Sequence, residues 1–528
     1  MNRAGVKKIK RFIPLMSIGF LLVALVIAGG SATRPAVTDY PRTTSFAIAP
    51  AQNSALRQVL TPGTAAHPGL SGFHLITQGN DALMIRLGMI QAAEHSLDIQ
   101  YYSFQDDVSG KLLLEALLRA ADRGVRVRIL VDDLTLKKSD ENWSLLNAHP
   151  GIELRLFNPF ATFEQSYISR IGNLFTSGMH FTKRMHNKAF IADNQLAIIG
   201  GRNLGDAYFD NNQDFNFRDV DILAVGPITP QVSSDFDRFW NGDEAYPFAV
   251  LQPDKTDEAA MARFRETLKS NWTDTVEKGA LAALPPVAAQ LQSGTLPLIW
   301  AHAELAADTP AKVDQSKDIA VSKPADKLEQ LAANARQEFL IVSPYFVPGD
   351  PGVQWLHEMI RRGVHVRVLT NSLASTDVVA VHAGYRRYRQ QVIADGADLY
   401  EMEPIPGKHP KSGRFASASR VSLHTKIFII DRSDVLIGTM NLDPRSIQLN
   451  TEAALVIHSP ELASQLVGLF TRATAPTSSY HVTLDGSRLQ WNAQENGEDV
   501  HYDSEPKADF RRTLEVNLYA LLPFENQL

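Results

Sequence analysis

The sequence predicts an α/β protein built from two similar halves, and two observations support this prediction. The first is a repeating order of helix and strand with short connections, which is typical of βαβ units and a mostly parallel sheet. The second is that this order occurs twice, around Gly124-Val-Arg-Val-Arg-Ile-Leu and around Gly363-Val-His-Val-Arg-Val-Leu. The two copies are separated by far more than the roughly 20 to 50 residues of a solenoid unit, so they indicate a duplicated domain.

Each element of the two halves is predicted from its apolar pattern. Helices have apolar residues three and four apart, and buried strands are short apolar runs between turn residues. The first half is expected to contain a helix over 82–94, a strand over 96–104, a helix over 111–123 and a strand over 125–131. The second half is expected to contain a helix over 325–336, a strand over 338–346, a helix over 353–362 and a strand over 364–369.

Shifts in composition divide the chain into six segments. The expected segments are a signal peptide or membrane anchor (1–35), a linker (36–74), the first half (75–248), a connector (249–320), the second half (321–475) and a C-terminal extension (476–528). The linker is rich in Pro, Thr, Ala and Ser, which predicts little structure. The extension ends in amphipathic helical spacing over 511–522, which fits a helix docked on the core or one lying on a membrane surface.

The N-terminal segment has the pattern of a targeting signal. Basic residues between Lys7 and Arg11 precede the apolar residues 12–30, which as a helix would approach the roughly 30 Å thickness of a bilayer's hydrocarbon core. A cleaved signal peptide and an uncleaved anchor both fit this pattern. Either one places the residues that follow outside the cytoplasm, because flanking basic residues stay on the cytoplasmic side.

Composition excludes several classes of protein. The formal net charge of −6 argues against a nucleic-acid coat protein, so no nucleic acid is expected as a partner. The chain has no cysteine, which excludes disulfides, thiolate metal sites and a cysteine nucleophile. No cluster of histidines and carboxylates has metal-ligand spacing, so neither a metal nor another cofactor is expected. The sequence leaves the oligomeric state open.

Two short segments are near copies of each other and contain the residues expected to do chemistry. Residues 185–193 and 423–431 both contain the pattern His-x-Lys-x4-Asp, and a glycine and an asparagine follow each of them at the same spacing. The two copies are separated by nearly the same length of chain as the two matching strands, so they belong to the duplication. One such pattern would be a weak signal, because a lone histidine in a strand is usually structural, but two whole copies are a strong one.

The spacing within each copy predicts how its polar side chains lie. Residues i and i+2 of a strand face the same way, so the histidine and the lysine of each copy share a face. A turn after each copy predicts a hairpin that sets the following asparagine opposite the histidine. The resulting sets are His186, Lys188 and Asn203 in the first half and His424, Lys426 and Asn441 in the second. Two halves packed face to face would place both sets around one shared pocket.

These residue types suit phosphate chemistry. Lysine ammoniums and asparagine amides donate hydrogen bonds to phosphate oxygens and stabilise the charge that develops at phosphorus. Two histidines can divide the work, one as nucleophile and one as general acid and base. Asp219 and Glu452 occupy matching places before apolar strands and are candidates for orienting the histidines. Asp193 and Asp431 sit one residue from a turn, which indicates a structural role.

At these residues the sequence resembles the phospholipase D superfamily over roughly residues 75–475. Residues 184–188, 200–206, 438–446 and 449–452 are similar to bacterial cardiolipin synthases, in particular the type C branch. The resemblance implies two α/β halves with one shared active site and phosphodiester exchange through a phosphohistidine without a metal. It also implies that the whole motif is catalytic, with Asp193 and Asp431 included. His186 is then our candidate for the nucleophile and His424 for the general acid and base.

The function implied by the resemblance is a bacterial phosphatidyltransferase that makes cardiolipin. Phosphatidylglycerol would be the acceptor, and phosphatidylglycerol or phosphatidylethanolamine the donor. The expected partners are phospholipids and the membrane surface, and the expected location is the bacterial cell membrane with the catalytic part on the periplasmic side. The alternatives are a phospholipase D that hydrolyses phospholipids to phosphatidic acid, a nuclease of the same superfamily, and an envelope lipid-binding protein with an inactive site.

Overall fold

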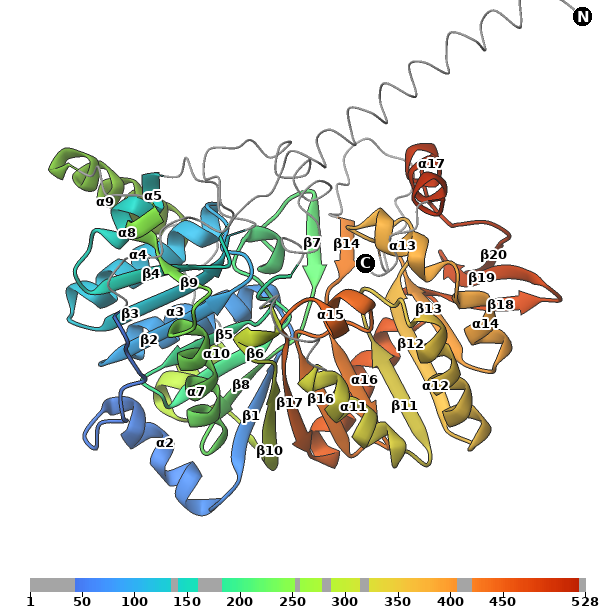
Figure 1. Cartoon of the computed structure of the whole chain (residues 1–528), viewed down its shortest axis with the longest axis horizontal. Helices are drawn as coiled ribbons and strands as arrows, with labels where there is room; N and C mark the ends of the chain where they lie inside the picture. Colours follow the sequence, from blue (N-terminus) through green and yellow to red (C-terminus); the bar gives the residue numbers. More distant parts are fainter. Residues whose placement is uncertain are drawn as a thin grey trace, which may run out of the picture.

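Two α/β halves lie side by side in this protein, the first coloured blue to green and the second yellow to red (Figure 1). The computed structural model describes residues 43–133, 141–159, 183–251, 257–277, 286–313, 322–405 and 420–521. The expected signal peptide or anchor over 1–35 lies outside the described residues. Within them, no helix has the length and apolar character needed to cross a bilayer.

The first half and the segment after it alternate helices and strands. In chain order these are α2 (Ala55–Ala66), β1 (Ser71–Ile76), α3 (Gly79–Ala92), β2 (Ser96–Tyr101), α4 (Val108–Asp122), β3 (Arg126–Asp132), α5 (Glu141–Asn147), β4 (Ile152–Phe157), β5 (Ala189–Ala192), β6 (Leu196–Gly200), β7 (Phe215–Arg218), β8 (Asp221–Val225), α7 (Ile228–Trp240), β9 (Ala245–Pro247), α8 (Phe248–Leu251), α9 (Glu258–Trp272), α10 (Pro286–Ser293) and β10 (Ile299–Ala307). The helix, strand, helix and strand predicted for this half correspond to α3, β2, α4 and β3.

The second half repeats the same order and adds a C-terminal extension. Its elements are α11 (Lys323–Ala333), β11 (Glu338–Val342), α12 (Gly349–Arg361), β12 (His365–Asn371), α13 (Val379–Tyr385), α14 (Arg389–Ala394), β13 (Asp398–Met402), β14 (Arg420–Leu423), β15 (Ile427–Ile430), β16 (Asp434–Gly438), α15 (Pro444–Gln448), β17 (Ala453–His458), α16 (Pro460–Ala473), β18 (Ser479–Asp485), β19 (Arg488–Glu495), β20 (Glu498–Tyr502) and α17 (Phe510–Tyr519). The predicted elements correspond to α11, β11, α12 and β12.

One 18-stranded sheet runs through both halves. From edge to edge, its order is β9-β4-β3-β2-β5-β6-β8-β1-β10-β17-β16-β15-β11-β12-β13-β18-β19-β20. The join is β10, which pairs with β1 through Ile299–Ala301 and with β17 through His302–Ala307. The segment expected only as a connector therefore supplies the strand that unites the halves.

The α/β class and the duplication are confirmed, but the sheet is mixed and not mostly parallel. Strands β2, β3 and β4 run parallel to each other, as do β11, β12 and β13. The other neighbours in the large sheet are antiparallel, and they include the two hairpins of the motif copies, β5–β6 and β15–β16. The expected linker over 36–74 is also more ordered than its composition predicts, since it contains α2 and the start of β1.

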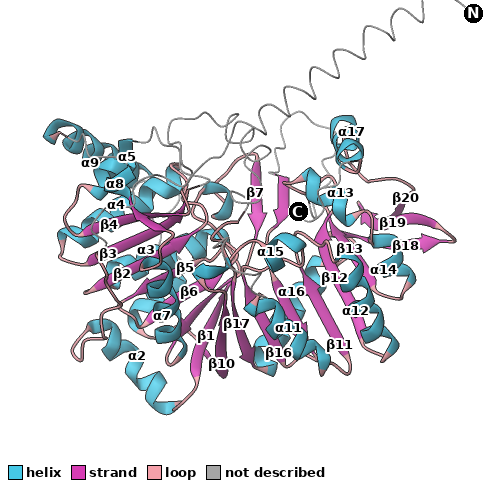
Figure 2. Ribbon diagram, in the orientation of Figure 1, coloured by secondary structure: helices cyan, strands magenta, loops and turns pink. Residues whose placement is uncertain are grey.

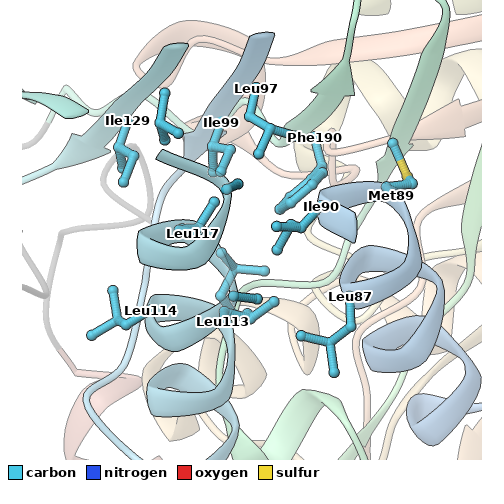
Figure 3. Packing of buried hydrophobic residues seen from close by; sticks show 14 of the residues in the cluster. Leu87, Met89, Ile90, Leu97, Ile99, Leu113, Leu114, Leu117, Ile129 and Phe190 are labelled. Carbon is cyan, nitrogen blue, oxygen red and sulfur yellow. The ribbon is translucent and has the colours of Figure 1, made fainter. Parts of the chain in front are cut away.

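Alternating side chains bury both faces of the central strands, and helices lie on both faces (Figure 2). Phe190 of β5 packs with α3 and α4 in one core (Figure 3), whereas its neighbour Ile191 belongs to a second core that contains residues of both halves. In β15, Phe428 belongs to a third core, under α11 and α12, whereas Ile429 belongs to the second core, which the two halves share. The shared core includes side chains of α7 and α16, so the halves are joined by apolar packing as well as by β10.

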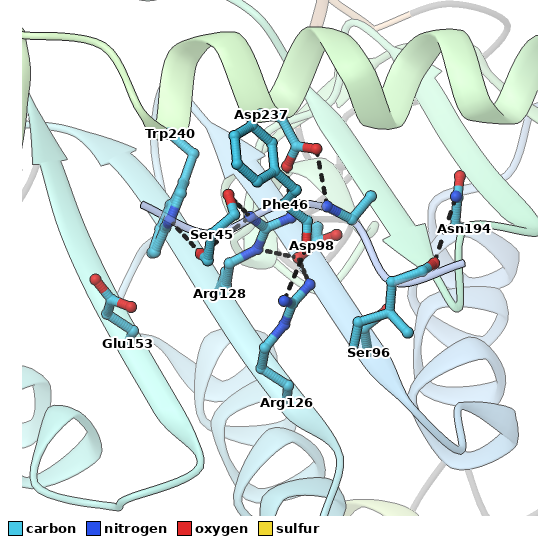
Figure 4. A network of polar contacts seen from close by, with 12 residues as sticks. Ser45, Phe46, Ser96, Asp98, Arg126, Arg128, Glu153, Asn194, Asp237 and Trp240 are labelled. Carbon is cyan, nitrogen blue, oxygen red and sulfur yellow. Dashed lines mark hydrogen bonds and ion pairs between the residues drawn. The ribbon is translucent and has the colours of Figure 1, made fainter. Parts of the chain in front are cut away.

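A buried polar network fixes the beginning of the described chain to the first half. The Arg128 guanidinium lies 2.6 Å from Asp98 and 2.7 Å from Asp237, and it also donates to the backbone carbonyl of Ser45 (Figure 4). Arg128 and Asp98 are fully buried, where an unpaired charge is costly, so this pairing stabilises the arrangement. Residues 43–48 consequently follow the first half closely.

Candidate active site

The two histidine–lysine segments lie just before the hairpins that were predicted to carry them. His186 and Lys188 precede β5, and His424 and Lys426 precede β15. In each copy the lysine ammonium donates a hydrogen bond to the backbone carbonyl of its own histidine, over 2.8 Å for Lys188. The lysine ammonium therefore lies against the backbone of its own histidine, at the start of the hairpin.

The hairpins are present, but their register differs by one residue from the prediction. Ala189 pairs with Ile199 in the first copy, and Ile427 pairs with Ile437 in the second. Both strands also begin only after the histidine, so neither histidine has a ladder partner in its own hairpin. The expected pairing of His186 with Asn203 is therefore corrected, as is the equivalent pairing in the second copy.

Each histidine is hydrogen-bonded to a carboxylate of the other half. His186 Nδ1 lies 2.8 Å from Oε2 and 3.0 Å from Oε1 of Glu452. His424 Nδ1 lies 2.6 Å from Oδ2 of Asp219. The two predicted orienting residues are thus in contact with the histidines, but the pairs cross between the halves. In each pair Nδ1 is occupied and Nε2 is the ring nitrogen left for chemistry.

Backbone pairing between the halves explains the crossed arrangement. His186 N–H donates to the carbonyl of Thr451, the residue before Glu452, over 3.0 Å. His424 N–H donates to the carbonyl of Arg218, the residue before Asp219, over 2.8 Å. This second contact continues the small parallel sheet that β7 forms with β14. Each histidine thus lies beside a segment of the other half that ends in a carboxylate residue. The side chain of that residue, Glu452 or Asp219, then reaches the imidazole of the histidine.

The two carboxylates are held differently. Thr439 donates its hydroxyl to Glu452 over 2.5 Å. In the first half the matching residue is Gly201, and a Cβ added there would lie 2.5 Å from Oδ1 of Asp219. Glycine at this position therefore leaves room for the aspartate, whose Oδ1 accepts instead from the backbone N–H of Val220 over 2.9 Å. The two histidine–carboxylate pairs occupy equivalent positions in the two halves, but the residues that hold their carboxylates differ.

Burial and like charges keep the histidines neutral before substrate binds. Burial is the main cause that lowers the pKa of His186 to about 4, with Glu452 opposing the shift and Lys188 adding to it. Burial and the nearby Lys426 and Lys188 hold the pKa of His424 well below its usual value. A neutral imidazole whose Nδ1–H donates to a carboxylate has a free lone pair on Nε2, which is the form a nucleophile needs.

The two lysines form a concentrated positive field. Burial is the largest cause that lowers the pKa of Lys188 to about 7, and the neighbouring Lys426 lowers it further. Burial likewise lowers the pKa of Lys426 to about 8, although Asp219 and Glu452 oppose the shift. Two ammoniums this close repel each other and are stabilised by an anion between them, so the site is suited to a phosphodiester.

Asn203 lies beside this cluster, and both predicted asparagines have unused hydrogen-bonding capacity. Asn203 donates from Nδ2 to the hydroxyl of Tyr208 over 2.9 Å, and the Tyr208 ring meets His424 edge-on at 5.3 Å. The Oδ1 atoms of Asn203 and Asn441 are buried and have no hydrogen-bond partner within the part of the chain that is described. Unsatisfied buried polar atoms are uncommon, and at a candidate site they indicate a bound ligand or water.

Asp193 and Asp431 lie away from the histidines, at the far ends of the hairpins. Asp193 accepts hydrogen bonds from the backbone N–H groups of residues 94–96, and Asp431 accepts from those of residues 336–338. Both have positive φ angles, 51° and 49°, as turn residues between antiparallel strands often do. These contacts support the structural interpretation of the two aspartates and show no contact with the reacting groups.

Aromatic residues at the site were missed from the sequence. The Tyr102 ring meets His186 edge-on at 5.3 Å and lies 5.6 Å from the Lys188 ammonium. On the other side, the Phe217 ring lies 5.0 Å from the His424 ring. Tyr102 directly follows β2, and ligands in α/β sheets bind at the carboxyl ends of parallel strands. That position was the available signal, but it did not distinguish this tyrosine from other residues after strands.

The fold and the site together define a class of enzyme. Two duplicated α/β halves meet at one centre that holds two imidazoles with anchored Nδ1 atoms and two ammoniums, which is a phospholipase D-type transfer site. In the described residues, no group of three His, Asp or Glu side chains is arranged to hold a metal ion. Lys188 and Lys426 lie at this centre, where they are buried close enough to influence each other's charge.

Comparison with known proteins gives the family. The chain matches the family described as cardiolipin synthase, PLD-like domain, over residues 87–240 and 328–474. It is 38% identical to cardiolipin synthase C of Escherichia coli strain K12, over 89% of this chain and 99% of that protein. It is also 34% identical to an uncharacterized Helicobacter pylori protein, over 84% of this chain and 87% of that one. The chain belongs to the phospholipase D-like cardiolipin synthase family.

A solved structure can be compared as well. The crystal structure of phosphatidylserine synthase from Haemophilus influenzae Rd KW20 superposes with a TM-score of 0.48 and 12% sequence identity, covering 79% of this chain and 90% of that one. The two matched segments of the cardiolipin synthase family contain both histidine–lysine copies, Asp219 and Glu452. Both halves of the described site therefore lie within the family's shared region.

Proposed function

We propose that this chain is a phosphatidyltransferase that makes cardiolipin through a phosphohistidine intermediate. The proposal rests mainly on the crossed pairs, in which His186 and His424 each have Nδ1 bound to a carboxylate and Nε2 left for reaction. Membership of the cardiolipin synthase family supports it. The proposed substrates are phospholipids, with phosphatidylglycerol as acceptor and phosphatidylglycerol or phosphatidylethanolamine as donor.

In the first step, His186 Nε2 attacks the phosphorus of the donor lipid. The bond from phosphorus to the headgroup oxygen breaks, and His424, protonated on Nε2, gives its proton to that oxygen, so glycerol or ethanolamine leaves with a hydroxyl group and not as an alkoxide. Lys188 and Lys426 stabilise the extra negative charge on the phosphoryl oxygens. The phosphodiester anion also raises the affinity of His424 for a proton, which offsets its low pKa in the empty site.

In the second step, the terminal glycerol hydroxyl of phosphatidylglycerol replaces the histidine. His424, now neutral, removes the hydroxyl proton as the oxygen attacks phosphorus, and the bond from phosphorus to His186 breaks. Cardiolipin leaves, and the histidines return to their initial protonation states, so atoms and charges balance over the cycle. Water in place of the hydroxyl would give phosphatidic acid, because the covalent intermediate is common to transfer and hydrolysis.

Product analysis with the purified full-length chain tests the proposal. Labelled phosphatidylglycerol is supplied in vesicles, alone and with phosphatidylethanolamine, and the lipid and water-soluble products are identified. Cardiolipin together with glycerol or ethanolamine is the expected result. Phosphatidic acid without cardiolipin would identify a hydrolase, cleaved DNA in a parallel assay would identify a nuclease, and no product with any substrate would leave a lipid-binding role.

The proposed location is the bacterial membrane, with the catalytic part on the periplasmic side. The support is the basic cluster before the apolar residues 12–30 and the positive-inside rule. A reporter that is active only outside the cytoplasm, fused after Leu528, is expected to be active in cells. A silent reporter on a stably expressed fusion would contradict this orientation without affecting the proposed chemistry.

A further inference from the structure

Helix α17 presents an apolar stripe to solvent. Phe510, Leu514 and Leu518 are four residues apart and share one side of the helix, and Leu521 follows just after the helix ends. Their exposed fractions are 84%, 49%, 56% and 80%. The opposite side carries Val516, the buried residue of the helix, which belongs to a small cluster with Leu373 and Ala383. The helix is thus attached by one face, and its apolar face is left uncovered by the described residues.

This stripe differs from the other exposed apolar residues of the described chain. Those other large residues are Phe46, Ile48, Val108, Val378 and Tyr519, the last of which ends α17 beside the stripe. Phe46 and Ile48 lie in the segment before α2 and Val108 begins α4, so these three form no stripe on one helix. Val378 directly precedes α13, the helix on which α17 packs. Exposed apolar side chains that gather in one place mark a site of interaction with a membrane or a protein.

Basic side chains accompany the stripe. Arg511 is highly exposed on α17, where it also pairs with Glu515 at 2.9 Å. Arg386 donates to Oδ1 of Asn517 over 3.0 Å, and Arg387 donates to the carbonyl of Ala520 over 3.1 Å, so both guanidiniums lie along the helix. An apolar helix face bordered by arginines matches the interface of a bilayer that contains anionic lipids, and it does so better than it matches an uncharged protein surface.

Helix α17 is also fastened to the edge of the candidate active site. Arg512 donates to the carbonyls of Leu373 and Thr376, both over 2.8 Å. The next residue, Asp377, accepts from the Tyr345 hydroxyl over 2.9 Å, and its charge raises the pKa of Lys426. In Figure 1, α17 lies along the same upper edge as β7 and β14, the strands that lead to Asp219 and His424.

We propose that the exposed stripe of α17 inserts into the interface of an anionic phospholipid bilayer and holds the mouth of the active site against the membrane. The membrane contact itself follows from the stripe and its arginines, whereas its benefit for turnover rests on the proposed function. A lipid in the plane of the bilayer would then reach the lysines without leaving the membrane entirely. This contact is separate from any anchoring by the N-terminal segment.

A single fluorescent label tests insertion directly, because the chain has no cysteine of its own. Leu518→Cys in the full-length protein is labelled with a polarity-sensitive dye and mixed with vesicles of phosphatidylethanolamine and phosphatidylglycerol. The expected result is a blue shift and quenching by lipids brominated on their acyl chains. The matched control is Gln58→Cys on α2, an exposed position at the opposite edge of the molecule, which is expected to show neither change.

Two outcomes of the label experiment would overturn the proposal. A dye at position 518 that is already blue-shifted without vesicles would show that this chain or a second copy covers the stripe. A dye that stays in water when vesicles bind would show that the stripe does not enter the bilayer. Either result is independent of catalysis, so it can be separated from a failure of the proposed function.

A turnover experiment tests the link to the active site. The variant Phe510→Ser with Leu514→Ser and Leu518→Ser is expected to lose about tenfold or more of its rate on vesicles, because the three side chains no longer anchor the helix. Its rate on short-chain phosphatidylglycerol, supplied as monomers below the critical micelle concentration, is expected to stay unchanged. Phe46→Ser, which removes an exposed phenylalanine elsewhere, is expected to change neither rate. An equal loss on both substrates would contradict the proposal.

Discussion

The Nδ1 atom of His186 lies 2.8 Å from Oε2 of Glu452, although the two residues come from different halves of the chain. The reciprocal pair joins His424 of the second half to Asp219 of the first over 2.6 Å. Neither half therefore contains a complete histidine–carboxylate pair of the candidate active site. The relationship gives each histidine a separate partner, and it makes the roles of the four residues testable one by one.

The two histidines are expected to respond differently to the leaving group. His186→Ala should abolish turnover and leave no covalent phosphatidyl-enzyme with any donor, since the nucleophile is gone. His424→Ala should slow reaction with natural lipids by about 10²- to 10⁴-fold, because an alkoxide leaving group needs a proton. With a nitrophenyl donor, whose leaving group needs no proton, the loss should be much smaller. Steady-state rates and trapping of the adduct measure both effects.

Both histidine variants must first be shown to fold, because each imidazole lies between the halves. Circular dichroism and thermal unfolding provide this control. Adduct formation with the activated donor in the His186 variant, but not in the His424 variant, would reverse the assignment. Near-normal activity in both variants would mean that the site is elsewhere.

The carboxylates are expected to follow their partners across the halves. Glu452→Gln should lower the rate with all donors, because the amide cannot hold the imidazole of His186 in the same tautomer. The effect should resemble that of His186→Ala but be smaller. Asp219→Asn should lower the rate mainly with poor leaving groups, like a milder loss of His424. The expected loss lies between about tenfold and the roughly 10⁴-fold seen where an aspartate that orients a catalytic histidine becomes an asparagine. The opposite dependence on leaving group would show that the carboxylates do not act through the crossed pairs.

Gly201→Ala is expected to disturb Asp219 and, through it, His424. The added Cβ would lie 2.5 Å from Oδ1 of the aspartate, so the carboxylate must move. The expected loss is about 10- to 100-fold with natural lipids and less with a nitrophenyl donor. The matched control is Gly468→Ala in α16, where the Cβ meets only the end of a flexible arginine at 3.5 Å. A Gly201 variant as active as the Gly468 variant would show that the close approach does not matter.

The pH dependence should reflect the buried histidine and lysines. With an activated donor, kcat/KM is expected to rise as pH passes about 4, where His186 loses its proton and becomes nucleophilic. It should fall above about pH 7 to 8, where Lys188 and then Lys426 lose the charge that stabilises the phosphoryl oxygens. The alkaline fall in kcat should come at higher pH, since a bound anion keeps the lysines protonated.

Lys188→Arg provides a control for the alkaline limb of this profile. A guanidinium stays charged at every accessible pH, so the first part of the decline should disappear if the variant is active. Lys188→Met should instead be slow at every pH. A wild-type profile that stays flat from pH 7 to pH 10 would contradict the assignment of the decline to the lysines.

Chelation is expected to leave the chemical step largely intact, because the lysines supply the positive field at phosphorus. The measurement is single-turnover formation of the covalent adduct, with and without EDTA, on a soluble donor. A modest effect on vesicles is compatible with this expectation, since anionic lipid surfaces themselves bind cations. Loss of adduct formation that one specific divalent ion restores would contradict it.

Much of the fold was predictable because its signals are local. The apolar spacing of α3, β2, α4 and β3 depends on neighbouring residues, and the copy of this pattern in the second half reinforced it. The duplication also identified His186 and His424, because two matching segments are far less ambiguous than one. The turn role of Asp193 was predictable for the same reason, since a turn is set by residues next to each other.

The remaining features depend on contacts between distant residues. The register that sets His186 beside Thr451 is fixed by packing between the halves, so the sequence indicated Glu452 but not which histidine it serves. The mixed sheet arises because the hairpins insert antiparallel strands between the parallel ones, which a strand count does not reveal. The role of residues 299–307 was hidden because their neighbours resemble a linker in composition.

The strand β10 also determines how this protein can move and unfold. Because residues 299–301 of β10 pair with β1 and residues 302–307 pair with β17, the halves cannot separate without breaking the backbone hydrogen bonds of one of these pairings. Heating should unfold both halves in one cooperative transition. Either half expressed alone would expose an unpaired strand edge, which promotes aggregation.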